Sequence, residues 1–383
     1  MKANRTRAYL FLLPLSIVIS MFLSCNNRSV SNYIDQKAIT ATGSTETKID
    51  TSSWLKPSKG IRSILEDSRG DIWFGGTGFV AVYNAHLPDG EGSNFTYFNE
   101  EEGWCGKGAS RIQEDENGII WIQAGGALCS YDGNRFSSHA LKPAESAREW
   151  ESAANDLWFK KEIERFGETE GPPGVYRYHG GAFTFQAFPV PQSEDANQLY
   201  NWMTDVIKGQ NGTIWFGTME AVIGFNGESR AAEPAAFTLI GREEMGRKNN
   251  PQNMGIRAVY EDSKGQLWIG DNGVGVFLYQ GDTTINFTQL HQLGPEDTDG
   301  NSLHRIFSIA EDDAGNMWFG TVYSGVWRFN SATGEWTNFT EKDGIRSDLI
   351  WTIYKTKQGE LLFGGEDPGG VYRFNGISFD RLY

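Results

Sequence analysis

One short unit recurs along this chain of 383 residues, and it limits the possible folds more than any other feature. A copy has an apolar run, an acidic Gly-containing turn and a second run with Trp, as in IRSILEDSRGDIWFGG from Ile61. Five further copies begin at Ser110, Met203, Ile256, Ile306 and Ile350. Trp121 and Trp215 stand 94 residues apart, about twice the 48 between Trp73 and Trp121. A degenerate seventh copy is therefore expected between them, and residues 155–159 (NDLWF) supply it.

Each copy is predicted to form four antiparallel strands. In the first copy, Ile61 to Glu66 gives one strand, and a turn with Gly reverses the chain before Ile72-Trp73-Phe74. Residues 80–83 and 94–98 supply the third and fourth strands. Four-stranded units with a period of about 45 to 55 residues are typical of propellers. We therefore predict an all-β fold, a seven-bladed β-propeller of four-stranded antiparallel blades, with the recurring Trp packed between blades.

These copies resemble the two-component regulator propeller repeat, whose pattern is roughly E-D-x-x-G-x-x-W-x-G-T followed by G-G-V-x-R-Y. Residues 306–329 and GVYRF at 370–374 match it best, and the resemblance covers nearly all of residues 61–379. It implies a sensory propeller that reads glycans or other extracellular ligands, often as the ectodomain of a membrane histidine kinase. Here the sequence ends at Tyr383, directly after the seventh copy, so we expect a stand-alone propeller with no kinase attached. Blade 3 departs from the pattern, because it lacks E-D-x-x-G and carries the charged insert 160–171.

The D-x-x-G-x-x-W hairpin also resembles the Asp-box of sialidases. In both families the Asp side chain accepts backbone N–H groups, and the Gly permits the chain reversal. We therefore assign a structural role and no catalysis to the acidic residues at this position, which are Asp67, Asp115, Asp262 and Asp312.

The N-terminus has the layout of a secretory signal peptide. Three basic residues precede the apolar run 9–23, and Ser24-Cys25 follows it. Residues 22–25 (FLSC) resemble a bacterial lipobox, which implies lipidation of Cys25 after cleavage, although Phe22 replaces the usual Leu. An ordinary cleavage beside an incidental Cys is the alternative. We predict a signal peptide at 1–24, a flexible tether at 25–53 and one propeller over 54–383.

Charge narrows the choice of partners. Without its signal peptide the chain carries 31 Lys and Arg against 49 Asp and Glu, a net charge of −18. Nucleic acid and anionic lipid surfaces are therefore poor partners. We expect a monomer at the cell envelope, on either face of the outer membrane, that touches the membrane only through its acyl anchor. Its partner would be an extracellular polar ligand or an envelope protein.

The cysteine and histidine content adds few constraints. Cys105 and Cys129 remain after Cys25, and an exported protein can either join them in a disulfide or bury both as thiols. The five histidines are scattered and lack metal-ligand spacing, so we predict no metal and no cofactor.

A ring of side chains is expected at one mouth of the propeller, where the first strand of each blade starts and the second strand ends. Alignment of the copies puts mixed cationic, hydroxyl and aromatic residues at one equivalent position: Arg62, Ser110, Thr204, Arg257, Phe307 and Trp351. The neighbouring loops add Trp202, Glu220, Asp271, Asn272, His304, Tyr323, Glu366 and Asp367. Aromatic faces beside charged groups suit a carbohydrate or another polar ligand, while solvated loop residues with no ligand are the alternative.

Three functions remain open from sequence. The first is a lipid-anchored envelope propeller that binds an extracellular ligand or a partner protein. The second is a scaffold that docks through long loops such as 241–255 and 290–301. The third is a propeller lyase or glycosidase, with His304 and Glu366 as one candidate pair and Glu366, Asp367 and Asp271 as candidate carboxylates. We assign no catalytic residue and favour binding over catalysis.

Overall fold

A computed structural model describes residues 60–84, 94–100, 102–125, 127–141, 147, 149–161, 171–190, 199–227, 236–246, 255–294, 302–347, 349–366 and 368–382. The chain divides into two units, residues 1–50 and 51–383, and all of the described residues belong to the second. The predicted signal peptide, Cys25 and the tether lie outside the described residues. No helix within these ranges is long and apolar enough to cross a membrane.

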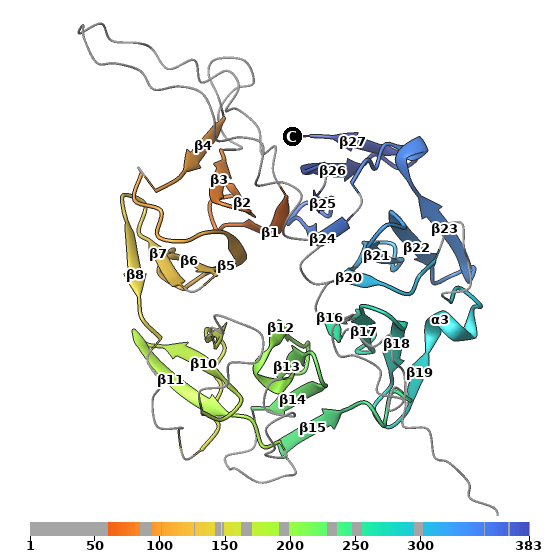
Figure 1. Cartoon of the computed structure of the whole chain (residues 1–383), viewed down its shortest axis with the longest axis horizontal. Coiled ribbons are helices and arrows are strands. Elements are labelled where there is room, and N and C mark those ends of the chain that lie inside the picture. The colour runs from red at the N-terminus through yellow and green to blue at the C-terminus, as the bar shows by residue number, and fades with distance from the viewer. Residues whose placement is uncertain are drawn as a thin grey trace, which may run out of the picture. The chain divides into compact units, whose positions relative to one another are not determined.

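Seven antiparallel sheets, each made of consecutive strands, are arranged in a ring around a central axis (Figure 1). Blades 1 to 3 comprise β1 (Ile61–Glu66), β2 (Ile72–Gly76), β3 (Phe79–Tyr83), β4 (Phe95–Phe98); β5 (Ala109–Glu114), β6 (Ile120–Ala124), β7 (Ala127–Tyr131), β8 (Phe136–His139); and β9 (Leu157–Lys160), β10 (Gly174–His179), β11 (Ala182–Ala187). Blades 4 and 5 comprise β12 (Met203–Lys208), β13 (Thr213–Thr218), β14 (Val222–Asn226), β15 (Phe237–Ile240); and β16 (Ile256–Glu261), β17 (Leu267–Asp271), β18 (Gly275–Tyr279), β19 (Thr284–Asn286). Blades 6 and 7 comprise β20 (Ile306–Glu311), β21 (Met317–Thr321), β22 (Val326–Asn330), β23 (Glu335–Phe339); and β24 (Leu349–Lys355), β25 (Leu361–Glu366), β26 (Gly370–Phe374), β27 (Phe379–Arg381).

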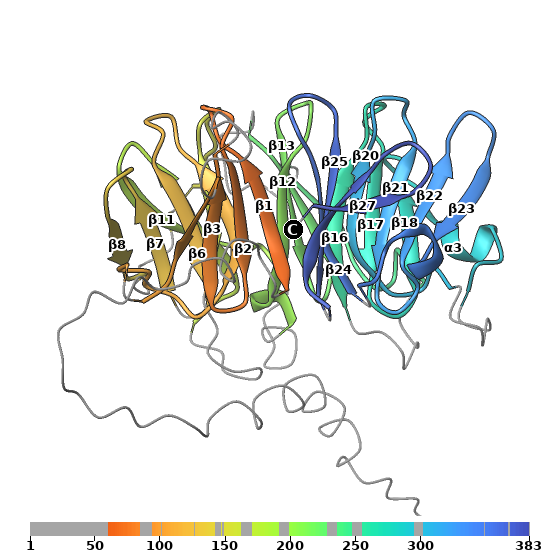
Figure 2. The ribbon, with the colours of Figure 1, turned by 90° about the horizontal axis from the view of Figure 1, so that it is seen from above.

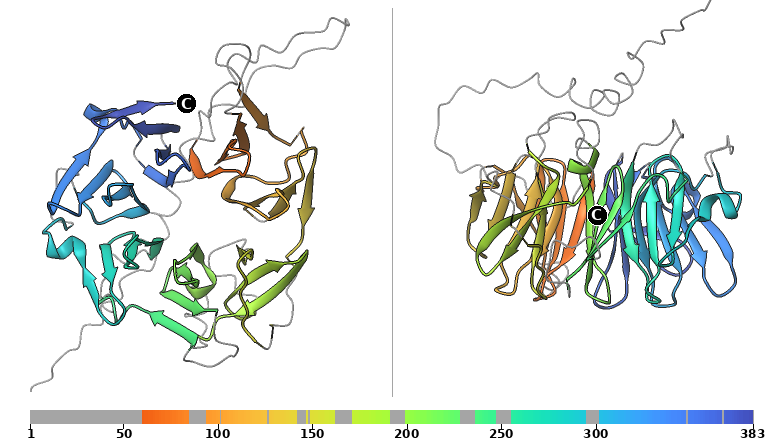
Figure 3. Two further views of the ribbon diagram at one scale, coloured as in Figure 1. Left: turned by 180° about the vertical axis from the view of Figure 1, so that it is seen from behind. Right: turned by 90° about the horizontal axis from the view of Figure 1, so that it is seen from below.

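The predicted seven-bladed propeller is confirmed. The first strand of each four-stranded blade lies innermost, and the fourth strand lies at the rim (Figures 1 and 3). The side view shows the strands running between the two faces of the disc (Figure 2). The short helices α3 (Phe287–Leu290) and η3 (Glu341–Asp343) follow outer strands of blades 5 and 6.

A buried Asp holds the turn after the inner strand, as the sequence predicts. In blade 1, Asp67 Oδ1 accepts the N–H groups of residues 69 and 71, each at 3.0 Å, and Oδ2 accepts the Trp73 indole N–H at 3.0 Å. Burial raises the pKa of Asp67, but hydrogen bonds from Trp73 and Arg69 outweigh it, so that pKa lies below its ordinary value of 3.8. The same Asp–Trp bond recurs from Asp115, Asp262 and Asp312. The carboxylates are engaged in fixing turns.

Blades 4 and 7 both lack the Asp of this pair, and they differ in what happens to the Trp. Blade 4 has Gly209 in place of Asp, and the Trp215 indole donates instead to Glu261 of blade 5 at 2.9 Å. Blade 7 lacks both groups, with Thr356 and Leu362 at the two positions. The loss of the Asp is thus compensated in blade 4 by a Glu of the next blade, whereas in blade 7 the Trp is lost with it.

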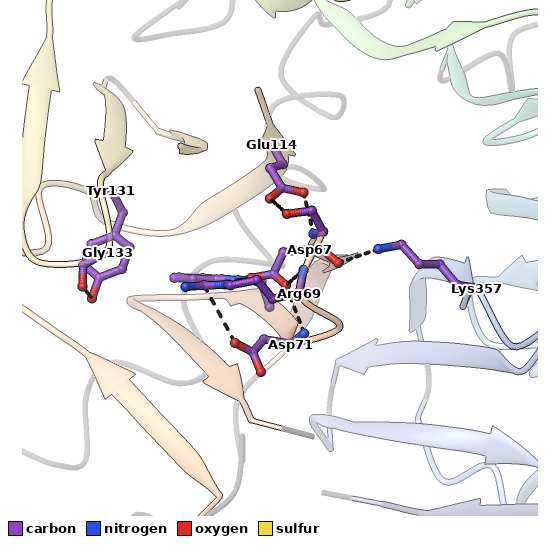
Figure 4. A network of polar contacts seen from close by, with 9 residues as sticks. Asp67, Arg69, Asp71, Glu114, Tyr131, Gly133 and Lys357 are labelled. Atoms are coloured by element: carbon purple, nitrogen blue, oxygen red, sulfur yellow. Dashed lines mark hydrogen bonds and ion pairs between the residues drawn. The ribbon is translucent and has the colours of Figure 1, made fainter. Parts of the chain in front are cut away.

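A glutamate at the end of the inner strand joins neighbouring blades. Its carboxylate accepts a backbone N–H from the turn of the preceding blade, and Figure 4 shows Glu114 and Lys357 approaching the blade 1 turn from either side. The four contacts are Lys357 to Glu66 at 2.7 Å, Ser68 to Glu114 at 2.6 Å, Gln210 to Glu261 at 2.8 Å and Ser263 to Glu311 at 2.7 Å. Blade 7 reverses the charges, because Lys355 replaces the Glu and meets Asp313 of blade 6 at 3.0 Å.

Blade 3 differs from the expected four strands. Its sheet has the order β11-β10-β9, and its Trp158 aligns with the second strand of the other blades, so the inner strand is the missing one in the described part of this blade. The sequence between Ala140 and Asp156 contains no alternating apolar run comparable to β1.

Side chains of blade 2 occupy the place of the missing strand. Gln123 stands where the other four-stranded blades have Gly, and its amide pairs in both directions with Lys160 of β9: Nε2 donates to the carbonyl oxygen at 2.6 Å, and Oε1 accepts the N–H at 3.1 Å. Gln113 Nε2 donates to the Trp158 carbonyl oxygen at 3.1 Å. Elsewhere this site must be Gly, since a Cβ on Gly320 would lie 2.7 Å from Ile350 of the next inner strand. Backbone polar groups of Lys160 and Trp158 on the inner edge of β9 thereby have hydrogen-bond partners, although no strand pairs with this edge.

The two remaining cysteines lie in the core between blades 1 and 2. Cys105 and Cys129 form a disulfide in the structure, with their Cα atoms 6.3 Å apart. Sequence reasoning left this pairing open.

Replacing Gln123 with the Gly of the other blades is expected to destabilise the protein. Gln123→Gly removes both hydrogen bonds between the Gln123 amide and the Lys160 backbone, each worth about 0.5–1.5 kcal/mol. The free energy of unfolding, measured by urea denaturation, should fall accordingly. The reciprocal change Gly320→Gln should also destabilise, because the next inner strand fills that space. A Gln123→Gly protein as stable as the wild type would contradict this role.

Candidate functional site at the propeller mouth

Every complete blade carries a β-bulge at the same place in its inner strand. The register with the second strand shifts between Ile61 and Ser63 in blade 1, and at the matching point of the five other four-stranded blades. The residues passed over are the predicted ring: Arg62, Ser110, Thr204, Arg257, Phe307 and Trp351. A bulge re-aims a side chain and is typical of strands next to functional sites. The sequence alignment found the ring positions, but it did not predict the bulge.

All six ring residues line one central cavity of about 510 Å³. This volume is within the range of about 300–1,000 Å³ that is usual for small-molecule sites. A second ring of β-branched aliphatic side chains lines the same cavity two residues further along each inner strand: Ile64, Ile112, Val206, Val259, Ile309 and Ile353. The cavity therefore combines a polar and aromatic ring with an apolar one.

Five residues, four of them from the ring, form a continuous set of contacts across blades 5, 6, 7 and 1. Arg257 lies over the Phe307 ring at 5.4 Å, and Phe307 meets Trp351 edge to face with centroids 4.8 Å apart. Arg62 lies over Trp351 at 4.7 Å. Glu366, from the end of β25, accepts the Trp351 indole N–H and pairs with Arg62 at 3.5 Å. We call Arg257, Phe307, Trp351, Arg62 and Glu366 the mouth cluster.

An ion pair bridges the side of the cavity where blade 3 lacks its inner strand. Arg111 of β5 lies 3.5 Å from the Asp205 carboxylate of β12, and its guanidinium donates to the Val206 carbonyl oxygen at 2.6 Å. Burial lowers the pKa of Arg111 and raises that of Asp205, and the attraction between the two groups opposes both shifts. The side chains stay about 29% and 27% exposed, so the pair faces the cavity without being sealed from it. Sequence reasoning missed both residues, although each directly follows a ring position.

Asp271, His304 and Tyr323 lie apart from the cavity lining, at the junction of blades 5 and 6. Asp271 is fully buried, and its Oδ1 accepts the Val274 N–H at 3.0 Å. The Gly273 N–H donates to the His304 carbonyl oxygen at 2.9 Å. Tyr323 has a positive φ of 67° and is 64% exposed, with Arg305 over its ring at 5.5 Å. The predicted set thus divides into the mouth cluster with Thr204 and this junction group.

The groups expected for catalysis are engaged in other contacts. His304 Nδ1 contacts the Ser302 hydroxyl, whereas Glu366 holds Arg62 and Trp351, and no hydrogen bond between described residues joins His304 to Glu366. Asp367 lies outside the described residues. Within the described ranges no group of His, Cys, Asp and Glu is arranged to hold a metal ion.

Several histidines are expected to make the fold sensitive to mild acid. Burial lowers the pKa of His139, His291 and His304 below the ordinary 6.5, and Arg305 adds to the effect on His304. Their contribution to stability is complete above pH 6.5 and is lost as the pH falls toward the folded-state pKa values, because the unfolded chain then binds more protons. The urea midpoint should be lower at pH 5.5 than at pH 7.5, and His304→Gln should reduce the difference. Equal midpoints at the two pH values would refute this expectation.

Comparison with known proteins identifies the repeat. The sequence profile of the two component regulator propeller matches residues 56–78, 250–273 and 299–323, at the first hairpins of blades 1, 5 and 6. The chain carries two component regulator propeller repeats. No curated protein sequence matches it.

The fold of this chain is similar to that of several solved propellers. The extracellular domain of a proposed one-component system of B. thetaiotaomicron aligns at 17% identity and a TM-score of 0.54, covering 84% of this chain but 39% of that one. The WD40 propeller domain of Doa1 aligns at 10% identity and 0.51, covering 84% and 95%. Sqt1 of Saccharomyces cerevisiae aligns at 12% and 0.52, covering 86% of each chain. These similarities establish the fold, and this chain spans well under half of the first relative.

Proposed function

We propose that this protein is a lipid-anchored binding module of the cell envelope that captures a small polar ligand, such as a carbohydrate, in its central cavity. The observation that carries the proposal is the conserved geometry of the ring: six bulges in one chain direct chemically different side chains into one cavity. A purely structural position would repeat one residue type, as the aliphatic ring does. Bulges re-aim side chains beside functional sites, so six bulged positions around one cavity support a recognition role.

The mouth cluster has the chemistry of a saccharide site. Phe307 and Trp351 add aromatic surface, partly covered by Arg257 and Arg62, for the apolar side of a sugar ring. Arg257, Arg62 and Glu366 offer donors and acceptors for hydroxyl groups. Arg62 and Glu366 fix each other, so part of this polar surface is held in place before a ligand arrives.

Other surfaces give less support for docking or catalysis. The large hydrophobic side chains that remain exposed among the described residues are Leu239, Leu290, Tyr323 and Ile377, each in a different blade. An interface usually needs a contiguous apolar patch. His304 and Glu366 have separate partners, which leaves a binding role as the better account of the mouth.

Blocking the cavity is expected to abolish ligand binding without unfolding the protein. Ser110 is an exposed ring residue, and Ser110→Trp would fill the mouth, whereas Ser137→Trp places the same bulk on the rim strand β8. A ligand at 100 times its Kd stabilises the native state by about 2.7 kcal/mol, which a thermal shift assay detects. An oligosaccharide that raises the Tm of the wild type and Ser137→Trp, but not of Ser110→Trp, would support the proposal. Equal shifts in all three proteins would place binding elsewhere.

The anchor is tested separately. Cys25→Ser should release the protein from the membrane fraction and prevent labelling by a fatty acid, because a thioether-linked lipid requires the thiol. Membrane association and labelling that persist in Cys25→Ser would contradict lipidation at this residue.

A further inference from the structure

The cavity has a charge opposite to that of the rest of the protein. The whole chain carries a net charge of −15. The charged residues lining the cavity are Arg62, Arg111, Lys160, Arg257 and Lys355 on the cationic side and Asp205 on the acidic side. A concave site with one sign of charge attracts and concentrates ligands of the opposite sign. The contrast indicates selection for an anion at this place.

Most of these cations already have a carboxylate partner. Arg62 pairs with Glu366, Arg111 with Asp205 and Lys355 with Asp313. These pairs hold the seam between blades 7 and 1, the open side of blade 3 and the contact between blades 6 and 7. These three ion pairs stabilise contacts between blades, and the positive charge of each cation is largely neutralised by its carboxylate.

Arg257 is different. Among the described residues its guanidinium has no carboxylate in an ion pair with it, its buried Nε has no hydrogen-bond partner, and the guanidinium lies over the face of Phe307. Burial lowers the pKa of Arg257, Asp271 opposes the shift without a hydrogen bond, and Arg305 adds to it. An arginine remains protonated even so, and a partly buried charge without an ion-pair partner carries a desolvation cost. An oxyanion that accepted from this guanidinium would remove that cost.

A second unpartnered polar group lies one blade away. Thr204 Oγ1, on the ring position of blade 4, is buried and makes no hydrogen bond within the described chain. Inner strands β12 and β16 are direct neighbours, so Thr204 and Arg257 occupy adjacent ring positions on the cavity wall. A guanidinium beside a hydroxyl matches the oxygens of a carboxylate or a sulfate, which arginine binds with paired N–H donors.

We propose that the cavity takes an anionic ligand whose carboxylate or sulfate group binds Arg257 and Thr204, beside the aromatic pair of Phe307 and Trp351. This inference rests on the proposed function of the same cavity and adds the charge of the ligand. Uronic acids and sulfated sugars are saccharide classes that carry such a group.

Isothermal titration with three disaccharides of one size tests the charge requirement. The probes are digalacturonic acid, galactobiose and galactobiose monosulfate. An acidic probe should bind at least tenfold more tightly than galactobiose, and the advantage should shrink between 50 mM and 500 mM NaCl as screening increases. The stronger of the two acidic probes decides between a carboxylate and a sulfate.

Two variants assign the effect to one residue. Arg257→Gln should remove the tenfold advantage, whereas Arg373→Gln removes the same charge from an exposed pair with Glu360 outside the cavity and should preserve it. Arg257→Lys keeps the charge, should retain part of the advantage and serves if Arg257→Gln fails to fold, as judged by its Tm.

The outcomes separate the two proposals. Equal affinity for galactobiose and an acidic probe, with binding blocked by Ser110→Trp, would overturn the anionic ligand and leave the binding cavity in place. An acidic advantage that is unchanged in Arg257→Gln would place the anion elsewhere and also overturn the inference. Binding of all probes that survives Ser110→Trp would overturn the cavity itself.

Discussion

The blades are held together at the turns after their inner strands, and in blades 1 and 5 this turn is bonded twice, once within the blade and once to its neighbour. A buried Asp such as Asp67 organises the turn and accepts the indole N–H of the core Trp. A Glu from the next blade then accepts a backbone N–H of that turn, as Glu114 does from Ser68. The core Trp, the turn and the spacing between blades are therefore fixed together. The cavity at the centre keeps its dimensions because these contacts repeat around the ring.

Much of the fold follows from the repeat. The period and the Trp anchors predict seven blades, and the acidic turn residues are correctly assigned to structure. The ring of residues is also predictable, because equivalent positions of a propeller meet at one mouth. The repeat pattern could not predict that blade 3 lacks an inner strand in its described part. Gln123 in place of Gly was visible in the sequence, and it marks the blade whose neighbour lacks an inner strand. Why the other four-stranded blades require Gly at this position is clear only from the structure, in which a Cβ on Gly320 would collide with the next inner strand.

Pairings across long sequence distances were also beyond sequence reasoning. Arg62 and Glu366 are 304 residues apart and meet because the ring closes between blades 1 and 7. The Arg111 to Asp205 pair arises only because blade 3 is incomplete at its centre. The sequence analysis assigned His304, Asp271 and Tyr323 to the mouth, because His304 precedes an inner strand and the other two lie at or just after the end of a second strand. The structure puts them at a blade junction, because the bulge turns only the inner-strand residues toward the axis.

The manner of ring closure has a consequence for how such chains change over evolutionary time. Among the described residues, each sheet consists of consecutive strands, and blade 1 shares no strand with blade 7. A whole blade is thus one continuous stretch of gene. Duplication or loss of that stretch would alter the number of blades without changing the path of the chain in the other blades. The contacts that close the ring between the last and the first blade, Arg62 with Glu366 and Glu66 with Lys357, would remain available. Selection can then refine one ring position at a time, because each belongs to a separate unit.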